Sequence, residues 1–261
     1  MVANVKNFPI LLQLRRTRFE YHFRNDCNVN YFRGVYPSFK HALQDAPNTK
    51  RHGYDNAPAA RMYKERTERV YSTDYPVLYW LTKFQSRIQT VFDFGGHIGV
   101  HFYSYQKYFS FSNLTSWTVC EVPAVIDEAR KFPLYEKGTI LNFVTDVSNS
   151  DGYDLFLANG SLQYLEWELH EKLRRLNRLP KFLIVNMLPL HKNTRTITLQ
   201  SIGTSFCPYL LRKRSEFISG LEGLGYELLD EWNNEEKSCA IAFETERSLD
   251  HYKGMTFAWK H

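Results

Sequence analysis

An acidic residue and three glycines stand close together in the stretch VFDFGGHIGVHF, at Asp93, Gly95, Gly96 and Gly99. Glycines at such spacing let the backbone turn sharply and let a ligand approach without a Cβ in the way. The run before them, Thr90 to Phe94, is apolar and β-prone, and the segment after them can continue as a helix. The stretch therefore predicts a strand, a tight glycine turn and a helix start.

Three classes of ligand use this arrangement, and the residues disfavour two of them. A phosphate loop would read G-x-x-x-x-G-K-[ST], and no Lys-Ser or Lys-Thr follows these glycines. A nicotinamide or flavin site would read G-x-G-x-x-G, but here the first two glycines are adjacent. The carboxylate of Asp93 would also face a pyrophosphate of like charge, which is unfavourable in a partly buried site.

The third class, S-adenosylmethionine, carries no phosphate and brings an ammonium and a sulfonium, so Asp93 has the right sign for it. A second acid is expected at the end of the next strand, where its oxygens can accept both ribose hydroxyls. Glu121 occupies that place at the end of WTVCE. The sequence thus predicts S-adenosylmethionine as cofactor.

DFGGHIG followed by WTVCEVP resembles motif I and its successor in class I S-adenosylmethionine-dependent methyltransferases. The wider pattern is similar to a bacterial family of methyltransferases encoded among polysaccharide and O-antigen biosynthesis genes. It extends from about Phe32 to Trp232 and includes FRGVYPSFKHAL, GYDN, LANGSLQYL, LIVNMLP and GYELLDEW.

The resemblance implies a set of cofactor contacts. For the methionine portion it implies Asp93, Gly95, Gly96 and Gly99, with backbone groups of Asn159 and Gly160. For the ribose it implies Glu121, and for the adenine amino group Asp146, although a turn acid is an equally good interpretation of Asp146.

Methyl transfer from a sulfonium needs mainly an aligned acceptor, and a base only if the acceptor must lose a proton early. Candidates for that base are His97, His101, Tyr164 and His191. His191 follows the fifth predicted strand, which is the best topological position among them. No metal site is predicted. The absence of N-P-P-Y or D-P-P-Y after the fourth strand argues against methylation of an exocyclic base nitrogen.

The elements that must position these residues follow a repeating pattern along the chain. Apolar runs alternate with helical or loop stretches, and near-continuous apolar character is typical of parallel strands buried on both faces. The predicted strands are Thr90 to Phe94, Ser116 to Glu121, Thr139 to Val144, Tyr153 to Ala158 and Lys181 to Met187. YELLDEW and SCAIAFE read as a terminal antiparallel hairpin. The predicted fold is α/β, a Rossmann-like doubly wound, mostly parallel seven-stranded sheet with an antiparallel C-terminal hairpin.

Residues 1–88 are predicted to be a helical and loop appendage, and residues 89–261 the cofactor-binding domain. Helices are predicted at Phe8 to Phe23, Ser38 to Asp45, Ala59 to Tyr71, Tyr75 to Phe84, His101 to Phe109, Pro123 to Phe132, Gln163 to Leu179 and Glu216 to Leu224. The link between the third and fourth strands is short for a parallel crossover. Residues 188–214 form a long connection that, with the appendage, is expected to bind the acceptor.

The net charge of +5 is unevenly placed, because residues 1–70 hold 13 Lys and Arg against 6 Asp and Glu. This excess could attract an anionic acceptor or a membrane surface, but a solvated face is the favoured interpretation, because the dense basic block that marks nucleic-acid binding is missing. No run is long enough for a membrane span, and four scattered cysteines indicate reduced thiols, so a cytoplasmic protein is expected.

The function that these features favour is methyl transfer to a small or carbohydrate-like acceptor, at oxygen. Two alternatives stay open. One is a non-catalytic member that keeps the fold as a binding or scaffold subunit, and the other, disfavoured by glycine spacing, is a nicotinamide-dependent oxidoreductase.

Overall fold

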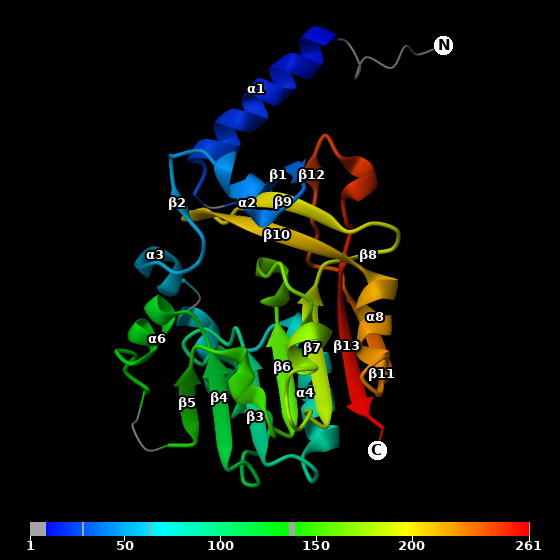
Figure 1. The fold of residues 1–261 in the computed structure, drawn as a ribbon. Coiled ribbons are helices and arrows are strands. Elements are labelled where there is room, and N and C mark those ends of the chain that lie inside the picture. The colour runs from blue at the N-terminus through cyan, green and yellow to red at the C-terminus, as the bar shows by residue number, and fades with distance from the viewer. Residues whose placement is uncertain (1–8, 28, 63, 136–138, 261) are drawn as a thin grey trace.

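The computed structural model describes residues 9–27, 29–62, 64–135 and 139–260, and its core is a seven-stranded sheet (Figure 1). The strands are β3 (Thr90–Phe94), β4 (Ser116–Cys120), β5 (Leu141–Val144), β6 (Leu155–Asn159), β7 (Phe182–Leu188), β11 (Tyr226–Asn234) and β13 (Tyr252–Trp259). Their order is β11-β13-β7-β6-β3-β4-β5. The pairs from β7 to β5 are parallel, whereas β13 is antiparallel to both of its neighbours. The predicted doubly wound α/β sheet is confirmed.

Helices cover both faces of this sheet because successive side chains of each strand point to opposite sides. On β6, Leu155 and Leu157 belong to one buried cluster, and Phe156 and Ala158 belong to another. The helices concerned are α4 (Tyr75–Phe84), α5 (Val100–Tyr105), α6 (Pro123–Ala129), α7 (Leu169–Leu173) and α8 (Arg214–Glu222). Side chains of α4 and α5 pack in the first cluster and those of α7 and α8 in the second.

A second sheet lies across the upper end of the first (Figure 1). Its strands are β1 (Tyr31–Tyr36), β2 (Arg51–His52), β8 (Leu190–His191), β9 (Thr196–Ser201), β10 (Ser205–Lys213) and β12 (Ile241–Ala242). It therefore joins segments from both sides of the boundary predicted at residue 88. The helices α1 (Pro9–Asn25) and α2 (Phe39–Gln44) pack on it through Phe23 and Ala42, and α3 (Ala57–Ala60) follows β2.

Two strand predictions were wrong. Residues 188–214, expected to be a connection, contain β8, β9 and β10, and the alternating β-branched residues of TITLQS were the available signal. The predicted hairpin partner SCAIAFE supplies only β12, which pairs with β1 in the second sheet. The antiparallel partner of β11 is instead β13.

Two of the predicted helices were also wrong in extent. The segment from Ala59 to Tyr71 is charged all round, so it has no apolar stripe to bury, and it forms α3, a turn and the 3₁₀ helix η2 (Lys64–Thr67). The segment from Gln163 to Leu179 keeps only α7 and the end of η5 (Leu162–Tyr164), because several of its backbone carbonyls bind a side chain of β10. Phe8 and Tyr63 lie outside the described residues.

The short link between β5 and β6 is a single 3₁₀ helix, η4 (Val147–Ser150), capped by Asp146. Two further 3₁₀ helices are η3 (Ser72–Asp74) and η6 (Thr245–Arg247). Within the described ranges, no helix is both long and apolar enough to cross a membrane.

Candidate functional site

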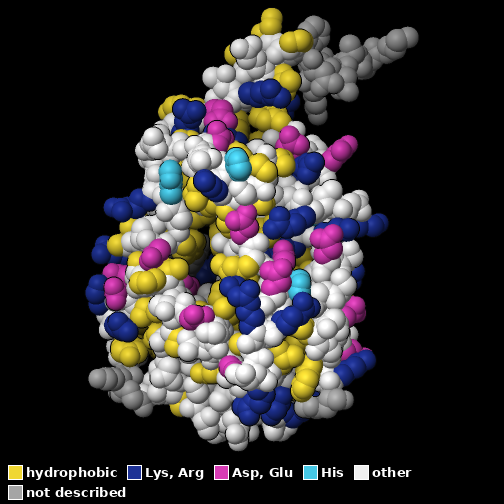
Figure 2. Space-filling model, viewed as in Figure 1, with side chains coloured by type: hydrophobic (Ala, Val, Ile, Leu, Met, Phe, Trp, Pro, Cys, Tyr) yellow, Lys and Arg dark blue, Asp and Glu magenta, His cyan; other side chains and the backbone are white. Residues whose placement is uncertain are grey.

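A cavity of about 720 Å³ lies where the carboxyl ends of β3, β4, β5 and β6 face the second sheet. Open parallel sheets bind their ligands at this end of their strands. In the space-filling view a hollow opens between the two sheets, with hydrophobic side chains beside it (Figure 2). The volume suits a ligand of drug size or a cofactor with a small acceptor.

The glycine turn that follows β3 forms part of the cavity wall through Gly95 and Gly96. Gly95 has φ 73°, and a Cβ there would clash with the side chain of Ser161. A Cβ on Gly96 would clash with the carboxylate of Asp93. Gly99, with φ 92°, is the N-cap of α5 and lies outside the cavity wall. The glycines thus let this turn pack closely on its own neighbours while its backbone faces the cavity.

Asp93 itself does not reach the cavity, because its side chain is fully buried beneath the turn. Both of its oxygens lie 3.1 Å from Nδ1 of His101, and Trp117 donates to Oδ2 at 3.2 Å. The direct contact with the methionine portion, expected for Asp93, is therefore not available to it. It acts on the cavity through His101, which does line the wall.

His101 bridges Asp93 and Asn159, the last residue of β6. Nδ2 of Asn159 lies 3.2 Å from Nε2 of His101 and donates to Oδ1 of Asp74 at 3.0 Å. Burial disfavours the charged imidazole, but the Asp93 carboxylate outweighs it and raises the pKa of His101. A buried polar network thus fixes the side chains at the carboxyl ends of β3 and β6.

The backbone of Gly160, expected to contact the methionine portion, is already engaged. Its N–H donates to the carbonyl of Asn186 at 2.9 Å, and its carbonyl accepts from Nε2 of Gln163 at 2.7 Å. Both Asn159 and Gly160 line the cavity. A ligand here would therefore bind the side chains around the turn and not the N–H of Gly160.

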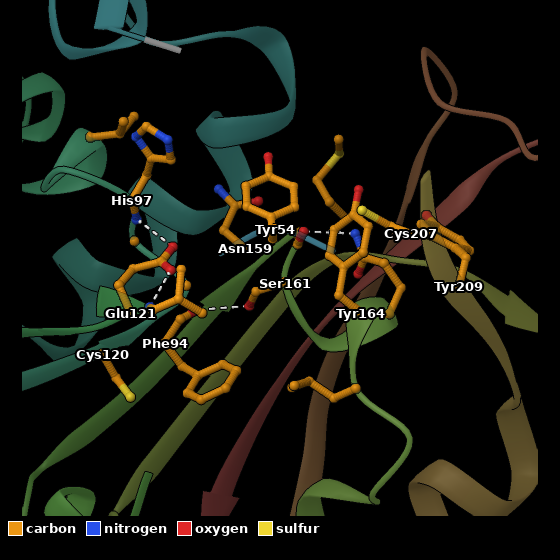
Figure 3. Close-up of a pocket in the computed structure, with 18 of the residues that line it drawn as sticks. Tyr54, Phe94, His97, Cys120, Glu121, Asn159, Ser161, Tyr164, Cys207 and Tyr209 are labelled. Carbon is orange, nitrogen blue, oxygen red and sulfur yellow. Dashed lines mark hydrogen bonds between the residues drawn. The ribbon is translucent and has the colours of Figure 1, made fainter. Parts of the chain in front are cut away.

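Glu121 lies at the end of β4 and faces the cavity (Figure 3). Its carboxylate accepts from the backbone N–H of His97 at 3.1 Å and of Val122 at 2.9 Å. Burial raises the pKa of Glu121 to about 7, and the two N–H donors oppose that rise. The carboxylate is held where it can accept further hydrogen bonds from a ligand.

Asp146 also lines the cavity, after β5. Its carboxylate accepts from the backbone N–H of Ser148 at 2.8 Å, and this hydrogen bond lowers its pKa. Asp146 is therefore both a turn acid and a cavity residue, so the two interpretations of the sequence are compatible.

His97 adopts a left-handed backbone conformation with φ 55°, in the middle of the glycine turn. The side chain is 6% exposed, and burial lowers its pKa to about 4, so the imidazole is neutral at pH 7. His97 lines the cavity beside Glu121 (Figure 3). A base of such low pKa is weak, and His97 is better suited to shape the pocket.

His191 lies outside the cavity wall, on β8. Its Nε2 is 3.1 Å from the carbonyl of Glu246, and its Nδ1 accepts from the backbone of Asn193 and Thr194. Both ring nitrogens are thus used in a local turn. The expectation that His191 acts as a base in the cavity was wrong, because the chain after β7 passes directly into β8 of the second sheet and carries His191 away from the cavity wall.

Tyr164 and three further aromatic residues form one side of the cavity, which we call the aromatic wall: Phe32, Tyr54, Tyr164 and Tyr209. The rings of Tyr54 and Tyr164 are 5.4 Å apart, as are those of Tyr164 and Tyr209 (Figure 3). The hydroxyl of Tyr164 donates to Oε1 of Gln200 at 3.0 Å. Sequence reasoning missed Phe32 and Tyr54, because only the pairing of distant strands brings them to the site.

The fold of this chain is similar to that of proteins of known structure. A protein from Listeria monocytogenes, assigned as an S-adenosylmethionine-dependent methyltransferase, superposes with a TM-score of 0.50 at 11% identity, over 73% of this chain and 99% of that one. The 1,6-didemethyltoxoflavin-N1-methyltransferase of Burkholderia thailandensis gives a TM-score of 0.46 at 18% identity, over 73% of this chain and 79% of that one.

No protein-family model and no curated protein sequence matches the chain. The chain has a Rossmann-like fold, which it shares with the Listeria monocytogenes protein. Within the described part of the chain, no group of three or more His, Cys, Asp or Glu side chains is placed to hold a metal ion.

Proposed function

We propose that this protein transfers the methyl group of S-adenosylmethionine to an oxygen of a small, carbohydrate-like acceptor. The observation that carries the proposal is the place of Glu121, at the carboxyl end of the strand beside β3, with its carboxylate in the cavity. From there it can accept hydrogen bonds from both ribose hydroxyls. The fold and the glycine turn support the same cofactor.

In this proposal the cofactor lies across the carboxyl ends of β3, β4, β5 and β6. Glu121 binds the ribose, Asp146 binds the adenine amino group, and the backbone of Gly95 and Gly96 borders the methionine portion. Asp93 contributes indirectly by holding His101 against Asn159. Cofactor binding supplies an activated methyl group, so the protein has to hold the acceptor in line with it.

The acceptor is proposed to lie on the aromatic wall. Tyrosine rings present both an apolar face and a hydroxyl, which suits the alternating faces and edges of a sugar ring. The pair of Tyr164 and Gln200 offers a donor and acceptor at hydrogen-bond distance from each other, which can orient an acceptor hydroxyl. Membership of a polysaccharide pathway is part of this proposal and rests on the sequence resemblance.

The second sheet and residues 51–74 are proposed to cover the cofactor and hold the acceptor. Residues His52, Tyr54 and Asp55 line the cavity together with the glycine turn. This arrangement would exclude water from the reacting groups, as covers over active sites commonly do. The acceptor-side role expected of residues 1–88 is thereby shared with β9 and β10.

The test is incubation with methyl-labelled S-adenosylmethionine and a panel of sugars, nucleotide sugars and glycans, scored by the mass shift of the acceptor. We expect labelled product with the unaltered protein, and much less with Glu121→Gln. Glu222→Gln, an exposed acid on α8, is the matched control and should retain activity. Binding of S-adenosylhomocysteine without transfer to any member of the panel would favour the non-catalytic alternative.

A further inference from the structure

Three basic side chains line the same cavity as Glu121 and Asp146: Arg66, Arg69 and Lys237. They come from segments far apart in the sequence, one after α3 and one between β11 and β12. The hydroxyl of Ser72 donates to Oε1 of Glu236 at 2.6 Å and joins the two segments. This contact brings the three basic residues close together.

The two arginines are held by one aromatic ring. The guanidinium carbons of Arg66 and Arg69 lie 4.7 and 5.0 Å from the ring centroid of Tyr71. The backbone N–H of Tyr71 donates to Oδ2 of Asp74 at 2.8 Å, and Nε of Arg69 donates to the Tyr71 hydroxyl at 3.2 Å. The position of both charges is therefore set before any ligand binds.

Lys237 is half-buried, and in the described ranges its Nζ has neither a hydrogen-bond acceptor nor a carboxylate partner. Burial and the nearby charge of Arg66 lower its pKa, while Glu236 opposes that effect. Glu236 is itself bonded to Ser72. A partly desolvated ammonium without a partner is unfavourable, and an anion bound beside it would remove that cost.

The backbone places Lys237 next to the aromatic wall. Cys239, two positions along the chain, is fully buried in the same cluster as Phe32 and Tyr209, with Tyr164 packed against it. The hydroxyl of Tyr209 donates to that of Tyr252, a further member of the cluster, at 2.7 Å. A ring bound on the aromatic wall would therefore carry its substituents toward the basic residues.

We propose that Arg66, Arg69 and Lys237 form an anion subsite that binds a carboxylate or phosphate group of the methyl acceptor. This inference rests on the proposed function and narrows its acceptor to a ring-containing anion. The cavity wall thus contains both acidic residues for a cationic donor and basic residues for an anionic acceptor.

The test measures the binding of matched charged and neutral probes to the protein loaded with S-adenosylhomocysteine, by ligand-observed NMR titration. One pair is 4-hydroxybenzoate and 4-hydroxybenzamide. A second set is glucuronate, glucose 6-phosphate and glucose, which separates carboxylate from phosphate. The variants are Lys237→Gln and Lys237→Arg. Lys192→Gln, an exposed lysine outside the cavity wall, is the control.

We expect the charged probe of each set to bind more tightly than the neutral one. Lys237→Gln should weaken the charged probes about tenfold and leave the neutral ones unchanged. Lys237→Arg and Lys192→Gln should retain the preference. Equal binding of charged and neutral probes by the unaltered protein would overturn the inference.

A second outcome would also overturn it. If Lys237→Gln weakened S-adenosylhomocysteine but not methylthioadenosine, which lacks the amino-acid portion, the basic residues would belong to the carboxylate of the cofactor. Failure of the unaltered protein to bind S-adenosylhomocysteine would instead contradict the proposed function, and the preference for charged probes could still be measured without cofactor.

Discussion

At the scale of single residues, the carboxylate that matters most in the cavity is Glu121. In the sequence, the charge of Asp93 is the feature that favours a cationic cofactor. In the structure, Asp93 is fully buried and bonded to His101 and Trp117. Glu121, in contrast, lines the cavity and is held by two backbone donors. From its charge, Asp93 predicts the ligand class, and the structure leaves Glu121 as the acid that can contact the proposed cofactor.

The raised pKa of Glu121 predicts a pH dependence of cofactor binding. Ribose hydroxyls donate to the ionised carboxylate, so binding favours loss of its proton. Because the pKa is about 7, affinity for S-adenosylhomocysteine should rise between about pH 6 and about pH 8. Calorimetry in two buffers of different ionisation enthalpy would show proton release. Glu121→Gln should bind more weakly and lose this dependence, and an equal pH dependence in the variant would contradict the assignment.

Gly96 provides a second residue-scale prediction, because a Cβ there would meet the carboxylate of Asp93, which is buried and cannot move aside. Gly96→Ala should lower the free energy of unfolding by about 1–3 kcal/mol, measured by urea denaturation. The comparison is Gly53→Ala, where the new methyl group would meet open space but the φ of 77° strains an alanine, a strain that Gly96 does not share. A smaller loss in Gly96→Ala than in Gly53→Ala would show that the close approach to Asp93 is unimportant.

At the scale of elements, the strands of the first sheet were easier to predict from the sequence than the second sheet that they face. Thr90–Phe94 and Phe182–Leu188 are apolar runs buried on both faces, and their composition alone indicates this. The second sheet depends on pairing of β1 with β9 and of β10 with the two-residue strand β2, across large distances in sequence. The two residues of β2 show no periodicity, and local sequence does not reveal that β1 pairs with β9, so the aromatic wall could not be foreseen.

The broken helix after Tyr164 has a cause in β10. Arg212 is 2% exposed and donates to the carbonyls of Leu162, Leu165 and Trp167 at 2.8–3.0 Å, and its Nε donates to Glu168 at 2.7 Å. Leucines at helical spacing predict one long helix over this segment, but the pattern does not reveal a distant arginine that captures its carbonyls.

Arg212→Gln should therefore destabilise the protein and loosen the segment that carries Tyr164. We expect a loss of about 3–5 kcal/mol in the free energy of unfolding, because Glu168 and three carbonyls would lose their partner. Hydrogen exchange should increase over residues 162–168. Lys213→Gln, the neighbouring residue with an exposed ion pair to Glu216, is the control and should change stability by less than about 1 kcal/mol. Similar losses in both variants would refute this role.

At the scale of the whole molecule, the cavity exists because two sheets meet at one end of the parallel strands. The first sheet supplies the glycine turn and the acids, and the second supplies Phe32 and Tyr209 of the aromatic wall. The segment around Tyr71 and the loop at Lys237 add positive charge between them. The part of the cavity with the glycine turn and Glu121 could be predicted from local motifs, whereas the part with the aromatic wall and the basic residues follows only from tertiary structure.

Isothermal titration of S-adenosylhomocysteine, with NADH as the competing ligand class, tests the central claim most directly. We expect saturable binding of one S-adenosylhomocysteine per chain, no detectable binding of NADH, and affinity weakened about tenfold in Glu121→Gln but retained in Glu222→Gln. Binding of NADH, or unchanged affinity for S-adenosylhomocysteine in Glu121→Gln, would contradict it.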